Sequence, residues 1–398
     1  MSSLPATAER QRPLAGVEAL MGPLVETCSP DPGRPIAVAV SGGSDSMALF
    51  WHLSGWAERA RRPLHVLSVD HGLRAESTEE CRFVASQSAR AGHDCVLLSW
   101  DGHQSGQAAA RQGRHRLLAK AARQAGAEVL CLGHTLDDVV ETLLMRRRRG
   151  VKSASQAGPV LASASPVWPH GRGLAMVRPL LLSRRLALRH WLEQGGRHWI
   201  DDPSNANPAY ERARLRQQLS RHPDWREPLG RLALLALRRR HAAGASLAAV
   251  LRDRQHVRVD PDGLIRFDGT GLDHSRAALV LGVLIRVASG GDRLPRPAAV
   301  SEVPGRIARP GDRMTIGGAW LQKSRGGLLI GRDPGAARAR LVHGLWDGRY
   351  EADATAPERV PVAPLLRQSA PPGSGWREVL SDRLDHEAAL MDLSGQLA

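Results

Sequence analysis

The feature that most constrains the fold is an alternation of short apolar runs with amphipathic stretches of helix length in the first half of the chain. The apolar runs cover residues 36–40, 64–69, 95–100 and 129–133, and the intervening helical stretches cover residues 45–56, 77–91 and 105–125. Apolar runs of this length are typical of strands buried on both faces. The alternation therefore predicts an α/β fold with a doubly wound parallel sheet, whose ligand site lies beyond the carboxyl ends of the strands.

The domain organisation follows from length and from changes in sequence texture. A chain of 398 residues suggests two or three domains. After the α/β region come a helical, arginine-dense stretch and then short β-like pieces separated by Pro and Gly. We predict an N-terminal extension at 1–34, the α/β domain at 35–216, a helical linker or middle domain at 217–255, a small β-containing C-terminal domain at 256–334, and a tail of unknown role at 335–398.

The composition excludes several classes of protein. The longest uncharged apolar run, residues 277–285, is half the ~18 residues that a membrane span requires, and the N-terminus has no apolar signal core, so we expect a cytoplasmic protein with no membrane partner. The net charge of +15, carried almost entirely by arginine, favours a polyanionic partner such as nucleic acid. The four cysteines form no C-x-x-C pair, so zinc, iron–sulfur and disulfide frameworks are unsupported.

The sharpest motif lies between the first apolar run and the helix that follows it, and consists of Ser41, Gly42, Gly43, Ser44, Asp45 and Ser46. Glycines let the backbone approach a phosphate, which the N–H groups and the positive end of the next helix can hold. None of the three lysines is near this loop, so γ-phosphoryl transfer of the G-x-x-x-x-G-K-[ST] type is disfavoured. The alternative is an ordinary Gly/Ser turn; the context favours an anion cradle.

A second motif follows the fourth apolar run and contains His134, Asp137, Asp138 and Glu141. If a helix begins near Leu136, the carboxylates lie on one face at spacings of three and four residues. Acidic groups at a helix N-terminus beyond a strand can hold the magnesium ion of ATP or an ammonium group. The alternative is that they only stabilise the helix dipole. A zinc site at His134 is a weaker interpretation, because no second His or Cys lies at ligand spacing.

These motifs together resemble a known family. The SGGSDS loop after a buried strand resembles the PP-loop of the ATP-pyrophosphatase superfamily, which includes tRNA-modifying enzymes, GMP synthetase and NAD synthetase. Four further segments choose among them, because in the same order they resemble motifs of the tRNA(Ile)-lysidine synthases. They lie at residues 69–74, 133–142, 178–180 and 201–205. The resemblance covers residues 35 to about 216 and predicts an ATP-dependent adenylating domain there, with tRNA binding by residues 256–334.

The resemblance implies ligation of free L-lysine to C2 of the wobble cytidine (position 34) in the CAU anticodon of tRNA(Ile), through an adenylated cytidine, using ATP and Mg²⁺. The implied catalytic residues are Asp45, Asp137, Asp138 and Glu141, with Asp45 and Asp138 as magnesium ligands. The loop from Ser41 to Ser46 together with Asp70 and His71 would bind ATP. The residues implied in binding lysine or tRNA are Arg111, Arg114, His134, Arg146, Arg178, Asp202, Asn205, Arg212 and Arg216.

The sequence departs from the family pattern at two points, and two other functions stay open. His115 follows Arg111 and Arg114 where the family has tyrosine, and Ala213 stands where it favours asparagine. The alternatives are another PP-loop tRNA modifier, such as a cytidine thiolase, and a non-catalytic RNA-binding protein of the same fold. With only 15 aromatic residues, phosphate contacts are favoured over extended base stacking. The oligomeric state is open, a homodimer being one arrangement.

Overall fold

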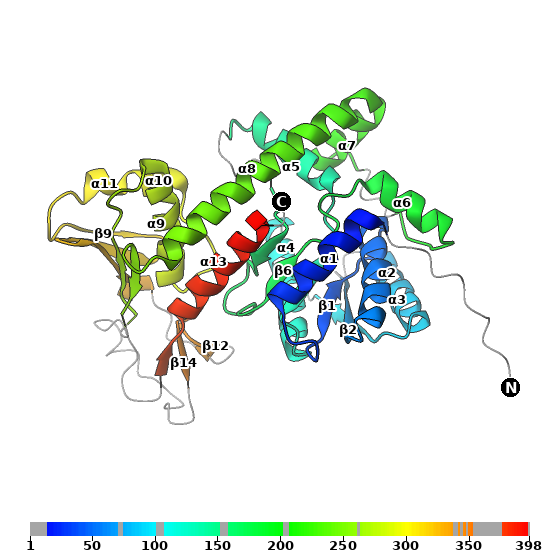
Figure 1. Ribbon diagram of the computed structural model, residues 1–398, viewed down its shortest axis with the longest axis horizontal. Coiled ribbons are helices and arrows are strands. Elements are labelled where there is room, and N and C mark those ends of the chain that lie inside the picture. Colours follow the sequence, from blue (N-terminus) through cyan, green and yellow to red (C-terminus); the bar gives the residue numbers. More distant parts are fainter. Residues whose placement is uncertain are drawn as a thin grey trace. The chain divides into compact units, whose positions relative to one another are not determined.

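The computed structural model describes residues 14–70, 75–100, 107–151, 158–201, 207–260, 263–336, 341–342, 345–347, 349–352 and 376–396. The chain divides into two compact units, and Figure 1 shows the elements of both. The first unit consists of Met1–Ser163, Leu174–His241 and Gln396–Ala398, and the second of Ala164–Gly173 and Ala242–Gly395. The α/β motifs identified in the sequence thus lie in the first unit.

The first unit is built on a six-stranded sheet with the order β3-β2-β1-β4-β6-β5. Its central strands β1 and β4 are fully buried, because both faces of the sheet are covered. The pairs β1–β2, β1–β4, β2–β3 and β4–β6 are all parallel, which confirms the predicted parallel, doubly wound sheet. The strands are β1 (Ile36–Ala39), β2 (Leu64–Asp70), β3 (Cys95–Ser99), β4 (Val129–Leu132), β5 (Ala162–Ala164) and β6 (Ala175–Val177).

Helices connect these strands, and two of them begin where the motifs predict. In α5 the N-terminus forms a capping box, since the Thr135 N–H and hydroxyl both donate to Asp138 Oδ2, at 2.9 and 3.1 Å. This cap fixes the helix start at Leu136. The helices are α1 (Ala15–Cys28), α2 (Ser44–Arg59), α3 (Ala75–Arg90), α4 (Gln107–Gln124), α5 (Leu136–Arg148), α6 (Arg185–Gln194), α7 (Glu211–Arg221), the 3-10 turn η3 (Pro223–Trp225) and α8 (Arg226–Arg252).

The strand order reverses direction between β1 and β4, which are adjacent in the sheet but far apart in the chain. From β1 the order runs to β2 and β3 on one side, and to β4 and β6 on the other. In doubly wound sheets the crevice outside the carboxyl ends of the strands at such a reversal is the usual ligand site. Both sequence motifs begin at this point, one after each strand.

The second unit is antiparallel. Its five-stranded sheet has the order β7-β8-β11-β10-β9, and α9 contributes Val280, Leu284 and Ile285 to a core shared with Leu321 and Ile330. A four-stranded sheet, β12-β13-β14-β15, draws on residues of the predicted tail. The elements are β7 (Val257–Val259), β8 (Ile265–Phe267), α9 (His274–Ala288), α10 (Pro297–Ser301), α11 (Val303–Arg306), β9 (Arg313–Ile316), β10 (Ala319–Ser324), β11 (Gly327–Arg332), η4 (Pro334–Ala336), β12 (Leu341–Val342), β13 (Leu345–Trp346), β14 (Tyr350–Ala352), β15 (Trp376–Glu378) and α13 (Leu380–Gln396).

Among the helices that the structure describes, none has both the length and the apolar character needed to cross a bilayer. The predicted domain boundaries stay predictions: α8 runs through the predicted 217–255 segment, and the second unit takes in residues on both sides of the predicted boundary at 334.

Candidate functional site

The loop after β1 is held in shape by its own serines. Ser46 Oγ accepts a hydrogen bond from the Ser41 N–H (3.1 Å), lies 3.2 Å from Ser41 Oγ and donates to the Gly43 carbonyl (2.9 Å). Gly42 has φ +84°, a left-handed conformation in which a side chain would be strained. The backbone then enters α2 at Ser44. The result is a preformed loop at a helix N-terminus, the geometry that binds phosphate.

Gly133 brings the second motif against this loop. A Cβ atom at Gly133 would lie 3.1 Å from the Asp45 carbonyl oxygen and equally close to the Ser46 backbone nitrogen. Only a residue without a side chain permits this approach, so the end of β4 packs directly on the first turn of α2. The next residues enter α5, which carries the acidic cluster. The loop and the acidic cluster therefore form one site, as their shared place in the predicted sheet indicates.

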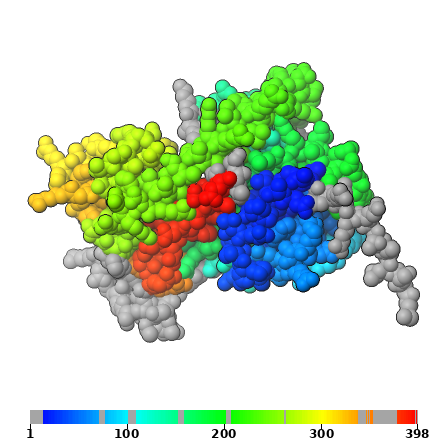
Figure 2. All heavy atoms as spheres, in the orientation of Figure 1, coloured from blue at the N-terminus to red at the C-terminus, as the bar shows by residue number. Residues whose placement is uncertain are grey.

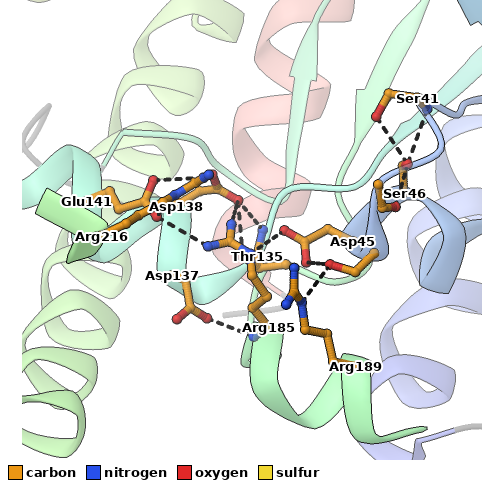
Figure 3. A network of polar contacts seen from close by, with 12 residues as sticks. Ser41, Asp45, Ser46, Thr135, Asp137, Asp138, Glu141, Arg185, Arg189 and Arg216 are labelled. Atoms are coloured by element: carbon orange, nitrogen blue, oxygen red, sulfur yellow. Dashed lines mark hydrogen bonds and ion pairs between the residues drawn. The ribbon is translucent and has the colours of Figure 1, made fainter. Parts of the chain in front are cut away.

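An arginine that the sequence analysis did not single out lies at the centre of this site. Arg185, at the start of α6, donates from Nε to Asp45 Oδ2 (2.7 Å) and from Nη1 to Glu141 Oε1 (3.3 Å). Its Nη2 lies 3.7 Å from Asp138 Oδ2, and its backbone N–H donates to Asp137 Oδ2 (2.8 Å). Figure 3 shows the guanidinium among the carboxylates. One residue thus contacts all four predicted catalytic carboxylates.

Two arginines of α7 complete the network from another side. Arg216 donates from Nε to Glu141 Oε1 (2.7 Å) and from Nη2 to Oε2 (3.2 Å), and the same Nη2 lies 3.7 Å from Asp138 Oδ1. Arg212 Nε lies 3.1 Å from Glu141 Oε2. The Glu141 side chain is only 1% exposed, and its carboxylate faces three guanidinium groups. This carboxylate is fully engaged in holding arginines in place.

Burial and charge act differently on the carboxylates. Burial raises the pKa of Asp45 above its usual value, and the ion pair with Arg185 only partly opposes that effect. Burial also acts on Asp138, but Arg185 and the Thr135 N–H together hold the pKa of Asp138 below its usual value. The carboxylates of Asp45, Asp138 and Glu141 in turn raise the pKa of Arg185. Burial and the neighbouring Arg178 lower the pKa of His134 to about 3, so its imidazole is neutral.

These residues line a cavity of about 2240 Å³ within the first unit. It also reaches Arg184, Arg185, Arg189 and His190, which the sequence motifs did not predict. Arg189 Nε donates to Ser44 Oγ (3.1 Å), so α6 contacts the loop through two arginines. The predicted residues that line the cavity are Ser41, Gly43, Ser44, Asp45, Ser46, Arg111, Arg114, His134, Asp137, Asp138, Glu141, Arg212 and Arg216.

Four described residues of the predicted site, Gly42, Asp70, Arg146 and Arg178, do not line the cavity. Arg178 is buried, and its Nη1 donates to the Val160 carbonyl (2.9 Å) and lies within reach of Ser163 Oγ and the Met176 carbonyl, which supports a structural role. Asp70 accepts hydrogen bonds from Ser77 and Thr78 in α3. Three further predicted residues, His71, Asp202 and Asn205, lie outside the described residues.

The fit of the site to magnesium rests on two carboxylates. Within the described part of the chain, no group of three or more His, Cys, Asp or Glu side chains is placed to hold a metal ion. Magnesium is usually bound by one or two protein carboxylates together with substrate phosphates. Asp45 and Asp138 supply two such carboxylates, and they lie close together, since Arg185 is 2.7 Å from Asp45 Oδ2 and 3.7 Å from Asp138 Oδ2. The donor set fits magnesium bound together with a nucleotide.

The cysteines do not support sulfur transfer. All four are free, and burial raises the pKa of the Cys28 thiol to about 12 and that of Cys95 to about 11. Burial likewise raises the pKa of Cys81, which lines the cavity, and of Cys131. The thiolate is the nucleophile in such chemistry, and these environments disfavour it. A thiolation reaction that uses the protein's own thiols therefore has no support in this site.

The parallel sheet and its switch point, where a glycine- and serine-rich loop opens a helix into a charged cavity, define a PP-loop nucleotide-binding protein. The PP-loop domain family matches residues 18–222. The chain is 37% identical over 338 residues to a tRNA(Ile)-lysidine synthase of Hyphomonas neptunium, covering 82% of this chain and 90% of that protein. A tRNA(Ile)-lysidine synthase of Caulobacter vibrioides is 35% identical, covering 85% and 78%. The chain belongs to the tRNA(Ile)-lysidine synthase family.

Similarity to solved structures is weaker. A U34-tRNA thiolase from Methanococcus maripaludis aligns with a TM-score of 0.39 and 15% sequence identity, covering 55% of this chain and 80% of that one. An NH3-dependent NAD synthetase from Campylobacter jejuni aligns with a TM-score of 0.31 and 10% identity, covering 56% and 91%.

Proposed function

We propose that this chain joins free L-lysine to C2 of the wobble cytidine in the CAU anticodon of tRNA(Ile), in the cytoplasm. The reaction consumes ATP, releases AMP and pyrophosphate, forms a carbon–nitrogen bond, and changes codon reading from AUG to AUA. Family membership over most of the chain supports this proposal. The observation that carries it is the union of a PP-loop with a carboxylate–arginine network in one cavity, since adenylation and amine chemistry need both.

In the first step the cytidine O2 attacks the α-phosphorus of ATP and pyrophosphate leaves. The loop N–H groups and the N-terminus of α2 would stabilise the charge that develops on the phosphates. Asp45 and Asp138 would hold a magnesium ion, which neutralises phosphate charge when it is bound. Arg189, which already contacts Ser44 of the loop, is placed to assist with the same charge.

In the second step the lysine ε-amine attacks C2 and AMP leaves. An ammonium of pKa ≈ 10.4 is only ~0.04% neutral at pH 7, so a carboxylate must take its proton. A carboxylate that binds the ammonium strongly also stabilises its unreactive form, which favours a division of roles among acidic groups. Glu141 faces three guanidinium groups and suits the role of positioning Arg212 and Arg216.

Asp137 is better placed than Glu141 to meet the amine. It lines the cavity and accepts a hydrogen bond from the Arg185 backbone N–H (2.8 Å). Among the ion pairs of the described residues none involves Asp137, so no guanidinium of this part of the chain engages the carboxylate. We therefore assign to Asp137 the role of meeting the lysine amine, and to Glu141 the role of positioning the surrounding arginines.

The test is incorporation of labelled lysine into an in vitro transcript of tRNA(Ile) with the CAU anticodon. A transcript with the wobble cytidine replaced serves as the substrate control, and omission of ATP as the reaction control. We expect incorporation only into the CAU transcript and only with ATP. Pyrophosphate release without incorporation of lysine or of any other amine that is offered would overturn the assignment of lysine as the substrate. Absence of both would leave an RNA-binding protein without this catalysis.

A further inference from the structure

An exposed aromatic pair lies at the turn between α7 and α8. The rings of His222 and Trp225 are stacked, with centroids 4.1 Å apart and planes inclined by 12°. Trp225 remains 42% exposed although it is one of the largest apolar side chains. The stacked pair presents a flat aromatic surface to solvent. The mechanism proposed above makes no use of this pair.

The surroundings of the pair suit a planar, largely apolar ring. Trp225 forms one wall of a hollow of about 370 Å³, a volume within the usual range of small-molecule sites. The remaining wall is mainly aliphatic, and Arg148 and Gln218, joined by a hydrogen bond of 2.9 Å, supply its polar groups. The aliphatic residues are Leu144, Leu215, Leu219, Pro228 and Leu229.

The charge around the pair favours an anionic partner. Residues 211–240 contain nine arginines and three acidic residues, and the two acidic residues next to the pair are Asp224 and Glu227. Glu227 is already paired with Arg231 at 3.0 Å. The surface of α7 and the first turns of α8 is open to solvent in the green region of Figure 2. The phosphate backbone of a nucleic acid fits this arginine-rich surface better than an apolar peptide does.

The pair also borders the cavity of the PP-loop. Pro223 and Asp224, which lie between the two stacked residues, and Arg226, which follows them, line that cavity. A polynucleotide that places a base in the cavity and leaves it past Pro223 and Arg226 would run beside the pair. Unpaired bases stack on aromatic side chains in single-stranded RNA recognition, where each stacked base contributes substantially to affinity.

We propose that His222 and Trp225 form a stacking platform for an unpaired base of the RNA substrate at the edge of the cavity. This inference rests on the proposed function, because it takes the cavity as the site of a tRNA base. Arg148, Arg221 and Arg226 would contact the flanking phosphates, whereas the aromatic rings would contact the base itself. The platform acts on binding and positioning of RNA and has no part in ATP binding.

The experiment measures tRNA affinity over a series of salt concentrations. Trp225→Ala should weaken binding of the CAU transcript roughly 5- to 150-fold, the loss expected for one stacked base, while Trp225→Phe should retain most of the affinity. The slope of log K against log [salt] should not change in Trp225→Ala, because no phosphate contact is lost. Arg226→Ala should instead reduce that slope by about 0.7–0.9. The KM for ATP should stay the same in both Trp225 variants, because Trp225 does not line the PP-loop cavity.

A matched control is Leu235→Ala, which removes an exposed apolar side chain of α8, 46% exposed, without removing an aromatic ring. It should bind the transcript like the unchanged protein. Wild-type RNA affinity in Trp225→Ala would overturn the platform. If this variant also changed its sedimentation while RNA affinity stayed the same, the surface would instead be a contact between copies of this chain. If the unchanged protein binds the transcript but incorporates no lysine, the proposed function fails while the platform can still be judged from binding.

Discussion

Replacing Arg185 by glutamine tests the central claim about the site, that one guanidinium balances several buried carboxylates. The substitution removes a hydrogen bond of 2.7 Å to Asp45, one of 3.3 Å to Glu141 and an ion pair of 3.7 Å with Asp138. The effect on each carboxylate differs. Glu141 keeps Arg212 and Arg216, and Asp138 keeps Arg216 and the Thr135 N–H, whereas Asp45 loses the guanidinium that it contacts.

The size of the effect follows from this one uncompensated group. Breaking a buried ion pair by removing one partner costs about 3–5 kcal/mol. The side chains of Arg185 and Asp45 are 19% and 18% exposed, so water can partly replace the lost contact. We therefore expect the free energy of unfolding to fall by about 3 kcal/mol, the lower end of that range. The assay is urea unfolding at neutral pH, followed by a probe in the first unit.

The dependence on pH has a definite sign. Burial already raises the pKa of Asp45, and loss of Arg185 raises it further. In the variant, the Asp45 carboxylate therefore binds a proton more readily in the folded than in the unfolded state. Asp138, whose pKa Arg185 helps to lower, loses part of the stabilisation that it supplies above its unfolded pKa. Both effects penalise the variant when the carboxylates are ionised. The deficit should be largest near pH 7 and should shrink as the pH falls towards about 4.

The neighbouring residue offers a matched control. Arg184 donates to the Arg226 carbonyl (2.7 Å) and lies 4.0 Å from Glu227, which is 69% exposed. Arg184→Gln should therefore change the free energy of unfolding by less than about 1 kcal/mol at either pH. Equal stability of Arg185→Gln and Arg184→Gln would refute the argument. A deficit in Arg185→Gln that is the same at pH 7 and near pH 4 would refute the role assigned to the carboxylates.

Three further substitutions separate the parts of the site. Asp45→Ala should abolish pyrophosphate release in the presence of tRNA and leave tRNA binding nearly unchanged, since many dispersed arginines carry that binding. Asp137→Asn should slow lysine incorporation by about 10²–10⁴, the usual contribution of a general base, while pyrophosphate release continues and adenylated tRNA accumulates. Ser46→Ala removes the hydroxyl that joins Ser41 to Gly43, so the KM for ATP should rise by about 5- to 30-fold, corresponding to ~0.5–1 kcal/mol for each of the two hydrogen bonds lost.

Each of these results has a clear opposite. Normal turnover in Asp45→Ala would contradict the PP-loop assignment. Parallel loss of pyrophosphate release and lysine incorporation in Asp137→Asn would place that carboxylate with ATP, and the lysine amine would have to be assigned elsewhere. Ser86→Ala, which removes an exposed hydroxyl bonded to the Phe83 carbonyl in α3, controls for Ser46→Ala and should leave the KM for ATP unchanged.

The sequence by itself determined the α/β architecture and the place of the site. Hydrophobic periodicity and glycine chemistry are local properties, so the strands, the loop from Ser41 to Ser46 and the start of α5 at Leu136 could all be predicted from short segments. A parallel sheet then brings the carboxyl ends of its strands to one edge. That rule placed the loop and the acidic cluster at the same edge of the sheet, and the adjacency of β1 and β4 brings them together there, with Gly133 against Asp45 and Ser46.

Only the tertiary structure decided how the charges of the site are distributed. Arg185 looks like any other arginine in an arginine-rich sequence, and its contacts reach Asp45 and Glu141, which lie 140 and 44 residues away along the chain. The placement of α6 and α7 encloses Glu141 among guanidinium groups, whereas no guanidinium of the described residues forms an ion pair with Asp137. Ion pairs carry no periodicity along a sequence, because they depend on side chains from distant elements meeting in three dimensions. The stacking of His222 on Trp225 could not be predicted either, because residue spacing does not specify how two rings in a turn are oriented.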